Sequence, residues 1–142
     1  MTNYYMNEAV FDLPDRPFED KTIHGWDAKL PGGHTLGVLV HRREIAPGQH
    51  LRQLMDENIA LNHKRLSFFQ VLEQLEASIG GAPGRILKTS WRSERGPSLQ
   101  LQAHVLFEGK WMIFAVTAPL DQRAVCEETF ESLLSSLAWR TD

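Results

Sequence analysis

The sequence predicts an α+β fold built on a largely antiparallel sheet. Segments in which apolar residues alternate with a period of two outnumber the segments with helical spacing. Their order is strands, helix, strands, helix, which lacks the regular alternation of βαβ units. The chain has 142 residues, of which 42% are hydrophobic, so we expect a single domain over 1–142 with a proper buried core.

The predicted strands lie between clusters of Pro and Gly, which mark tight turns. The segments with strand-like patterns are 6–13, 22–26, 35–42, 85–91, 99–107 and 110–117. Segment 68–79 fits either a strand or a continuation of the helix before it, because its periodicity matches both. We favour a strand that follows a break at Ser67.

Two segments have helical spacing. The first, 51–66, follows a Pro-Gly break and repeats Leu51, Leu54, Met55 and Ile59 along one face. The second follows Pro119, with Asp121 as the expected N-cap. Its apolar stripe consists of Cys126, Phe130, Leu133, Leu134 and Leu137. We expect both helices to pack on the same face of the sheet.

The stretch LQLQAHVLF at 99–107 determines which faces the sheet presents. A two-residue turn at Glu108 and Gly109 would form a hairpin with the next strand, since Gly tolerates the positive φ of such turns. The opposed pairs would then be Phe107 with Lys110, Leu106 with Trp111, His104 with Ile113, and Gln102 with Ala115. One face becomes apolar enough to receive the helices. The other, called the amide face here, carries Gln100, Gln102, His104, Leu106, Trp111, Ile113 and Ala115.

The amide face is expected to need a cover from outside the fold. The strand at 35–42 is also partly apolar on both faces, with Leu39 opposite in orientation to Val38 and Val40. A sheet that is apolar on both sides needs a layer on each, and the two helices suffice for one. Neutral amides among aliphatic side chains suit a hydrophobic helix that carries Ser, Thr and Gly. A homodimer interface would have a similar composition, so these alternatives stay open.

Composition argues against several other classes of protein. The net charge of -3 gives no basic surface for nucleic acid or an anionic membrane. The longest apolar run, WMIFAV, is far shorter than the roughly 20 residues that span a bilayer, so we expect no membrane insertion. The single Cys126 cannot form an internal disulfide, and the first residues lack the pattern of a signal peptide. These features favour a cytoplasmic protein.

No motif in the sequence indicates catalysis or a cofactor. The six histidines show no spacing typical of metal ligands, and the chain has no G-x-S-x-G motif. The Gly pairs lack the spacing of a phosphate-binding loop. Cys126 lies on the predicted buried stripe of a helix, where a thiol is usually a small structural hydrophobe. We therefore expect no metal, no cofactor and no catalytic residue, and an enzyme is the least favoured reading.

Five segments, taken in order, resemble the DcrB-like family, and within it the Eag-type chaperones encoded beside type VI secretion effectors. They are YYMNEAVFDLPD, DKTIHGW, GGAPGRILKTSW, SLQLQAHVLFEGKWMIFAVTAP and CEETFESLLSSL. The resemblance extends over nearly the whole chain and rests on this order, since no single motif is diagnostic. It implies a fold like that of Mog1 and PsbP, with a curved antiparallel sheet and helices packed against it.

The resemblance also implies a function. Eag-type chaperones are cytoplasmic homodimers that cradle the N-terminal transmembrane helices of a PAAR-containing effector, often of the Rhs class, until it is loaded on the secretion spike. The amide face would then be the floor of a groove for those helices. The alternative is a generic Mog1-like interaction module whose hydrophobic sheet face is a homodimer interface. Secreted and lipid-anchored DcrB relatives also exist, but we find no signal peptide or lipobox Cys here.

The family's groove positions can be placed on this chain one by one. Ile23 and Leu39 match its apolar positions, and Asn58 and 102–104 match its polar ones. Two positions after Ile23 the family commonly has a bulky aliphatic residue, where this chain has Gly25; this change would widen the groove or move the contact to Trp26. The predicted partner-binding residues are Ile23, Gly25, Leu39, Asn58, Gln102, His104, Leu106, Trp111 and Ile113.

Overall fold

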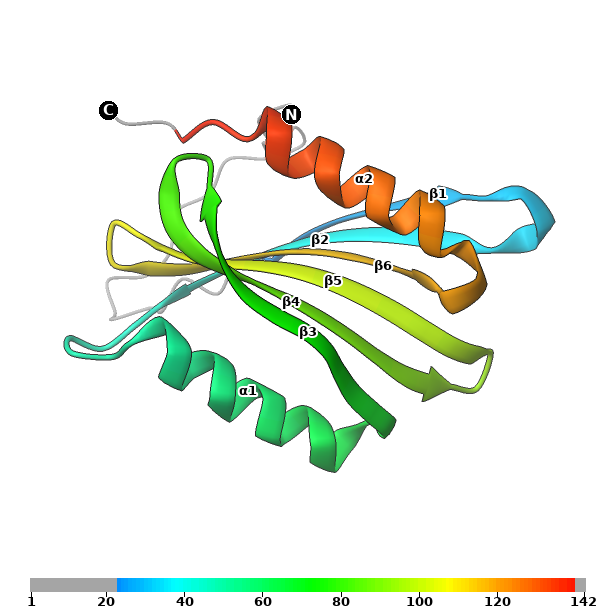
Figure 1. Ribbon diagram of the computed structural model, residues 1–142, viewed down its shortest axis with the longest axis horizontal. Coiled ribbons are helices and arrows are strands. Elements are labelled where there is room, and N and C mark those ends of the chain that lie inside the picture. Colours follow the sequence, from blue (N-terminus) through cyan, green and yellow to red (C-terminus); the bar gives the residue numbers. More distant parts are fainter. Residues whose placement is uncertain (1–22, 140–142) are drawn as a thin grey trace, which may run out of the picture.

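A six-stranded, fully antiparallel sheet forms the centre of the computed structural model, which describes residues 23–139 (Figure 1). The strand order is β1-β2-β6-β5-β4-β3. The strands are β1 (Ile23–Lys29), β2 (Thr35–Glu44), β3 (Ser67–Ile79), β4 (Ala82–Ser93), β5 (Gly96–Phe107) and β6 (Lys110–Pro119). The helices are α1 (Leu51–Arg65) and α2 (Arg123–Ser136). This architecture confirms the α+β prediction; the strand expected at 6–13 lies outside the described residues.

Strands β3 to β6 form a continuous meander joined by two-residue turns. In the last turn Glu108 and Gly109 have φ values of 51° and 75°, as in hairpin turns that match the twist of the strands. The predicted register is confirmed, since Leu106 pairs with Trp111 and Gln102 with Ala115. The strand prediction for 68–79 is also confirmed, because α1 ends at Arg65 and Leu66 is already extended.

The two helices lie on opposite faces of the sheet (Figure 1), so the expectation that both pack on one face is wrong. Helix α2 covers the apolar face, where Cys126 and Phe130 join the main core. Helix α1 instead buries Leu54 against Trp111 and Ile113 on the amide face. The physical reason is that Trp111 and Ile113 make this face apolar enough to bury one side of a helix.

The main core lies between the apolar face and α2. Its buried residues include Leu36, Val40, Leu99, Leu101, Ala103, Val105, Phe114 and Val116. Beyond α2, Trp139 stacks on Phe107 with ring centroids 4.3 Å apart, and its Nε1 donates to the Ile79 carbonyl at 2.9 Å. These contacts fasten the end of the described chain to the sheet.

The start of α2 differs from the prediction. Pro119 leads into a 3-10 turn over Leu120–Gln122, and the regular helix begins only at Arg123. Gln122 therefore occupies the N-cap position, without a side-chain capping bond. Asp121 lies inside the 3-10 turn, so its prediction as the N-cap is wrong by one residue.

Candidate functional site

A depression between α1 and β2 opens on the amide face, with a volume of about 170 Å³. We call it the amide pocket. Its lining is Leu39, His41 and Arg43 from β2, Asn58 and Asn62 from α1, Gln100 and Gln102 from β5, and Ile113 and Ala115 from β6. Aliphatic groups and neutral amides thus alternate around one opening, with the Arg43 guanidinium as a cationic group among them.

Sheet pairing and helix packing together build this pocket. Strand β2 is the neighbour of β6, so Leu39 lies opposite Ala115 and His41 opposite Ile113. Directly opposed residues share a face, which brings these side chains together. On α1, Asn58 and Asn62 follow the buried Leu54 at intervals of four residues and therefore lie on the same side of the helix. The packing of Leu54 on the sheet aligns both amides along the pocket.

A chain of hydrogen bonds runs along the amide face. The Trp111 Nε1 donates to His104 Nδ1 at 3.0 Å, and His104 Nε2 lies 2.6 Å from Gln102 Oε1. The Gln102 Nε2 donates to Gln100 Oε1. The Gln100 Nε2 in turn donates to Thr117 Oγ1 at 2.9 Å. This arrangement fixes the orientation of both amides, because turning either one around would place two donors or two acceptors against each other.

His104 determines the direction in which the hydrogen bonds run along the amide face. The ring is fully buried, and burial, with a smaller contribution from the nearby His41, lowers its pKa to about 3. A neutral imidazole has one donor and one acceptor nitrogen. Since Trp111 donates to Nδ1, the proton is on Nε2 and points to Gln102. The buried imidazole therefore satisfies both neighbours without a charge.

The β2 side of the pocket carries the remaining titratable groups. Burial, and next the positive charge of Arg43, lower the pKa of His41 below 6.5. The Arg43 guanidinium carbon lies 5.8 Å from the centre of the Trp111 ring, within the range of a cation–π contact. The indole thereby holds this arginine against the sheet at one end of the pocket.

The structure brings together part of the predicted partner-binding set. Leu39, Asn58, Gln102 and Ile113 line the amide pocket. Gly25 pairs with Leu39 in the register of β1 and β2, and a Cβ built on it would lie 3.2 Å from Leu39 Cδ1. A larger residue there would push on Leu39, so the glycine keeps the Leu39 side chain where it is.

Other predicted residues have different places. The expectation of an uncovered amide face is wrong for His104, Trp111, Gln102 and Ile113, all of which are buried beneath the layer that includes α1. Gln102 and Ile113 reach the pocket only at its floor, whereas His104 and Trp111 do not line it. His104 and Trp111 therefore support the pocket from below. Leu106 packs beside the Leu54 cluster and lines a separate open depression with Leu51 and Arg85.

Ile23 lies at the edge of the sheet, and five further residues join the pocket. Ile23 begins β1, where its register partner is His41. The pocket is also lined by His41, Arg43, Asn62, Gln100 and Ala115, which are not in the predicted partner-binding set. Of these, the sequence already assigns Gln100 and Ala115 to the amide face. The spacing of four from Asn58 could have identified Asn62.

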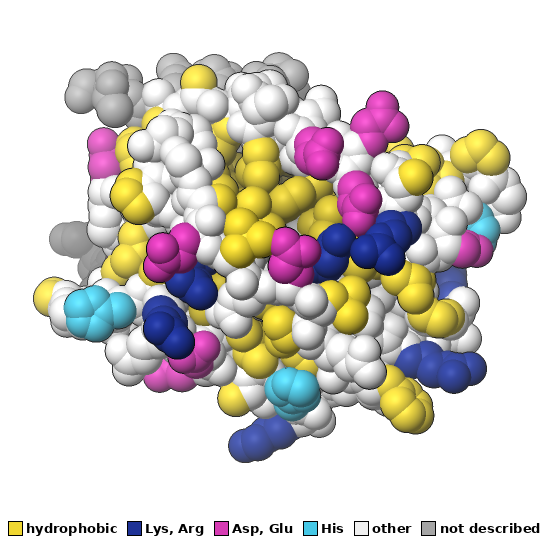
Figure 2. All heavy atoms as spheres, in the orientation of Figure 1, with side chains coloured by type: hydrophobic (Ala, Val, Ile, Leu, Met, Phe, Trp, Pro, Cys, Tyr) yellow, Lys and Arg dark blue, Asp and Glu magenta, His cyan; other side chains and the backbone are white. Residues whose placement is uncertain are grey.

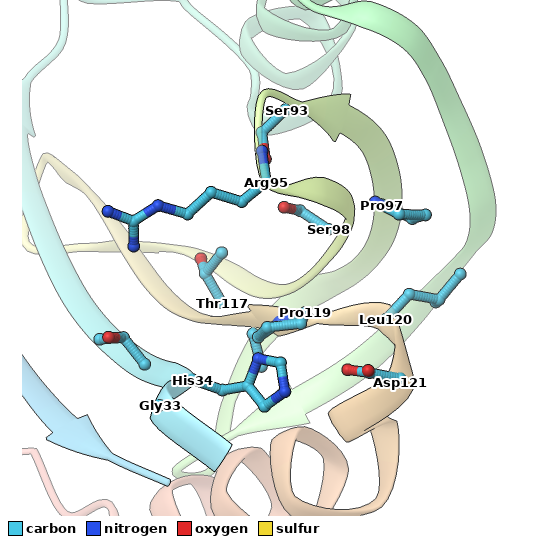
Figure 3. A pocket seen from close by; sticks show the side chains of 12 residues that line it. Gly33, His34, Ser93, Arg95, Pro97, Ser98, Thr117, Pro119, Leu120 and Asp121 are labelled. Carbon is cyan, nitrogen blue, oxygen red and sulfur yellow. The ribbon is translucent and has the colours of Figure 1, made fainter.

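A second cavity, of about 490 Å³, lies further along the same strands (Figure 3), and Thr117, the hydrogen-bond partner of Gln100, is among its lining residues. Turn residues from three parts of the chain line it, among them His34, Arg95 and Asp121. Arg95 and Asp121 are exposed there. Within residues 23–139, no group of three or more His, Cys, Asp or Glu side chains is placed to hold a metal ion.

Cys126 has the environment of a structural thiol. Its side chain is fully buried, and its Sγ donates to the Val116 carbonyl at 3.5 Å. Burial is the main cause that raises its pKa to about 11, so the thiol stays protonated at neutral pH. Because the thiolate is the reactive form, this environment suppresses nucleophilic chemistry.

Comparison with known sequences places the chain in a family. The sequence profile of the DcrB family matches residues 8–136. The chain belongs to the DcrB family. A search of curated protein sequences found no match. Among the helices of the described part of this DcrB-family chain, neither is long and apolar enough to cross a membrane.

Solved structures share the fold of this DcrB-family chain at low sequence identity. PA94 from Pseudomonas aeruginosa, a protein of unknown function, has a TM-score of 0.80 at 17% identity, with 99% of this chain and 98% of that one covered. LpqN of Mycobacterium tuberculosis, which is involved in cell envelope biogenesis, has a TM-score of 0.63 at 11% identity, with 86% and 84% covered. PsbP from the cyanobacterium Synechocystis has a TM-score of 0.56 at 12% identity, with 79% of both chains covered. The fold is therefore Mog1/PsbP-like, as expected.

Proposed function

We propose that this protein is a cytoplasmic chaperone that shields the N-terminal transmembrane helices of a type VI secretion effector of the PAAR/Rhs class before the effector is loaded on the secretion spike. Membership of the DcrB family and the resemblance to Eag-type chaperones support this proposal. The proposal assigns the protein a binding role, with no catalytic residue and no cofactor.

The observation that carries the proposal is the composition of the amide pocket. A transmembrane helix presents aliphatic side chains and scattered hydroxyl groups, and its usual neighbours in a membrane are aliphatic groups and neutral amides. The half-buried Leu39 offers the first kind of surface, with the buried Ile113 and Ala115 at the floor of the pocket behind it. The half-buried Asn58, Asn62 and Gln100 offer the second, with the buried Gln102 at the floor. In this proposal, side chains of the client helix enter the pocket while the helix lies between α1 and β2.

The hydrogen-bond chain supports the same role. A free amide can rotate and meet a partner with either its donor or its acceptor side. Here Gln100 and Gln102 are held in one orientation by His104 and Thr117 before any client arrives. Binding to such a pre-organised surface costs less side-chain entropy, which raises affinity for the complementary arrangement.

The alternative is a generic interaction module that uses the amide face as a homodimer interface. Helix α1 already covers part of this face, since its Leu54 packs on Trp111 and Ile113. The remaining opening is a depression between α1 and β2. A concave site of this kind suits the convex surface of a helix better than a second copy of the same face.

Leu39→Asp tests the proposal. Leu39 is half-buried at the pocket, so we expect the variant to fold, because its carboxylate can reach water. A client helix would remove that water and leave the charge unpaired, which costs several kcal/mol and lowers affinity about a hundredfold or more. The measurement is co-purification with, and affinity for, the N-terminal fragment of the effector encoded beside this gene, with circular dichroism as the check on folding.

Leu61→Asp is the matched control for this experiment. Leu61 is 41% exposed on α1 and does not line the amide pocket. The Leu61→Asp substitution adds the same charge as Leu39→Asp, but outside the pocket. We therefore expect the affinity for the client to stay within a few-fold of wild type. Equal binding by folded Leu39→Asp and Leu61→Asp would contradict the proposed use of the pocket.

A further inference from the structure

The second cavity continues the amide face toward one end of the sheet. Thr35 of β2, Ser98 of β5 and Thr117 of β6 line this cavity, which we call the turn cavity. Each lies an even number of positions from an amide-pocket residue of the same strand, so both cavities open on one face of the sheet. The four residues from Ile113 to Thr117 correspond to about 13 Å along the strand.

Small side chains separate the two cavities. Gly37 lies between Thr35 and Leu39 on β2 and pairs with Thr117, and Ala115 precedes Thr117 on the same face of β6. About nine residues of an α-helix cover the 13 Å between the cavities, at 1.5 Å per residue. A transmembrane helix of about 20 residues that lies along these strands is therefore long enough to reach both cavities.

The hydrogen-bond chain of the amide face ends in the turn cavity with a donor. Its bonds all run in one direction, from Trp111 through His104, Gln102 and Gln100 to Thr117. At the last step Thr117 Oγ1 accepts from Gln100, which leaves the hydroxyl proton for another acceptor. Within residues 23–139 the structure places no acceptor against this proton. Hydrogen bonds in a chain polarise one another, so this hydroxyl is a strengthened donor.

The charges around the turn cavity favour a neutral acceptor. Arg95 and Asp121 line it with opposite charges, and Asp27 Oδ1 lies 3.4 Å from where a Cβ on Gly37 would be. Figure 2 shows basic and acidic side chains together at this end of the sheet, on the right of the view. A carboxylate would meet the two aspartates. A carbonyl oxygen has no net charge and can accept from both the Thr117 hydroxyl and the Arg95 guanidinium, which line the same opening (Figure 3).

A transmembrane helix offers such acceptors at one end. The last four carbonyl groups of an α-helix have no partner within the helix, and the helix dipole makes this end negative. The donors of the amide face point toward Thr117, so the positive end of the hydrogen-bond chain lies at the turn cavity. An antiparallel arrangement of the two dipoles is favourable and brings the carbonyl groups to Thr117.

We propose that the client's transmembrane helix lies along the amide face with its C-terminal end in the turn cavity, where its last carbonyl groups accept from Thr117 and Arg95. This inference rests on the proposed function and adds the direction in which the client binds. The reversed helix would bring its carbonyl groups to Arg43, at the other end of the amide pocket. That guanidinium is already placed over the Trp111 ring.

Cysteine cross-linking measures the direction of the helix. The native Cys126 is fully buried and its pKa is raised to about 11, so it does not compete with introduced cysteines. Ser98→Cys marks the turn cavity, and Arg43→Cys marks the other end of the amide pocket. Each variant is co-expressed with the N-terminal fragment of the effector encoded beside this gene, which carries one cysteine at either end of each transmembrane helix in turn.

After mild oxidation, Ser98→Cys should form a disulfide with the C-terminal end of a client helix, and Arg43→Cys with the N-terminal end of the same helix. The reverse pattern would overturn the proposal. Disulfides with Arg43→Cys alone would also overturn it, because the client would then not reach the turn cavity.

Affinity measurements on the same fragment test the two donors. Arg95→Gln and Thr117→Val should each weaken binding about tenfold, the effect of one lost hydrogen bond. Thr117→Ser retains a hydroxyl and should recover most of the affinity that Thr117→Val loses. Arg92→Gln is the matched control for Arg95→Gln, since Arg92 is exposed near the end of β4 and does not line the turn cavity.

The outcomes separate this inference from the proposed function. Suppose that Leu39→Asp weakens binding while Arg95→Gln and Thr117→Val bind the fragment as tightly as wild type. The amide pocket then binds the client and the turn cavity does not, which overturns this inference alone. A wild-type protein that fails to bind the fragment would overturn both.

Discussion

At the residue scale, the sequence reveals which side chains share the amide face, but not the direction of the hydrogen bonds between them. The alternation of Gln100, Gln102 and His104 is visible in the sequence, because side chains two positions apart share a face of a strand. The direction of their hydrogen bonds depends on Trp111, which meets His104 from the next strand and sets its tautomer. No sequence pattern encodes that tautomer. The burial of His104 likewise depends on where α1 docks.

His104 should make the stability of the protein depend on pH. The folded-state pKa is lowered to about 3, whereas the unfolded side chain titrates near 6.5. Between these values the unfolded chain binds a proton that the folded chain does not, so stability falls as the pH is lowered through this window. The neutral ring contributes its full stability above 6.5. The slope from this group is about 1.4 kcal/mol per pH unit.

Urea denaturation of wild type and His104→Gln at several pH values between 4 and 7 measures this contribution. The variant should be less stable at neutral pH, because it disturbs the buried hydrogen-bond chain, at a cost of about 1–3 kcal/mol. It should also lose less stability on acidification. The lowered pKa of His41 acts in the same direction and is present in both proteins. Parallel pH profiles for the two proteins would contradict this account.

At the element scale, local signals predicted the strands and turns well. The hairpin of β5 and β6 follows from two residues, since Glu108 and Gly109 fix both the turn and the register of every pair behind it. Local signals did not predict which face of the sheet α1 covers. This choice depends on a contact between Leu54 and Trp111, two residues that are far apart in the sequence. Amphipathic spacing shows that a helix has a buried side, but not which surface receives it.

Shortening the Leu54 side chain should show how much the packing of α1 on the sheet contributes to the stability of the protein. Leu54 is 7% exposed and packs on Trp111 and Ile113, so Leu54→Ala should lower the free energy of unfolding by about 2–4 kcal/mol. Leu61→Ala, on an exposed part of the same helix, should stay within about 0.5 kcal/mol of wild type. Chemical denaturation of both variants provides the comparison. Equal effects would mean that α1 does not bury its Leu54 side on the sheet.

At the scale of the whole molecule, each helix covers one face of a curved sheet and leaves part of that face open. On the apolar side α2 completes the main core. On the other side α1 covers Trp111 and Ile113 but stops short of Leu39, which leaves the amide pocket between them. The sequence indicated that two helices could not cover two apolar faces. The division of the helices between the faces determines that the open surface is a depression with an α-helical wall.

The strand order has a consequence for how the chain folds. Strands β3 to β6 are neighbours both in sequence and in the sheet, whereas β2 reaches β6 through pairs such as Gly37 with Thr117. Closing such a long loop costs more entropy and slows the step that requires it. We expect amides of the β3–β6 meander to gain protection before those of β1 and β2 during refolding. Pulse-labelled hydrogen exchange would detect this order, and simultaneous protection of all six strands would contradict it.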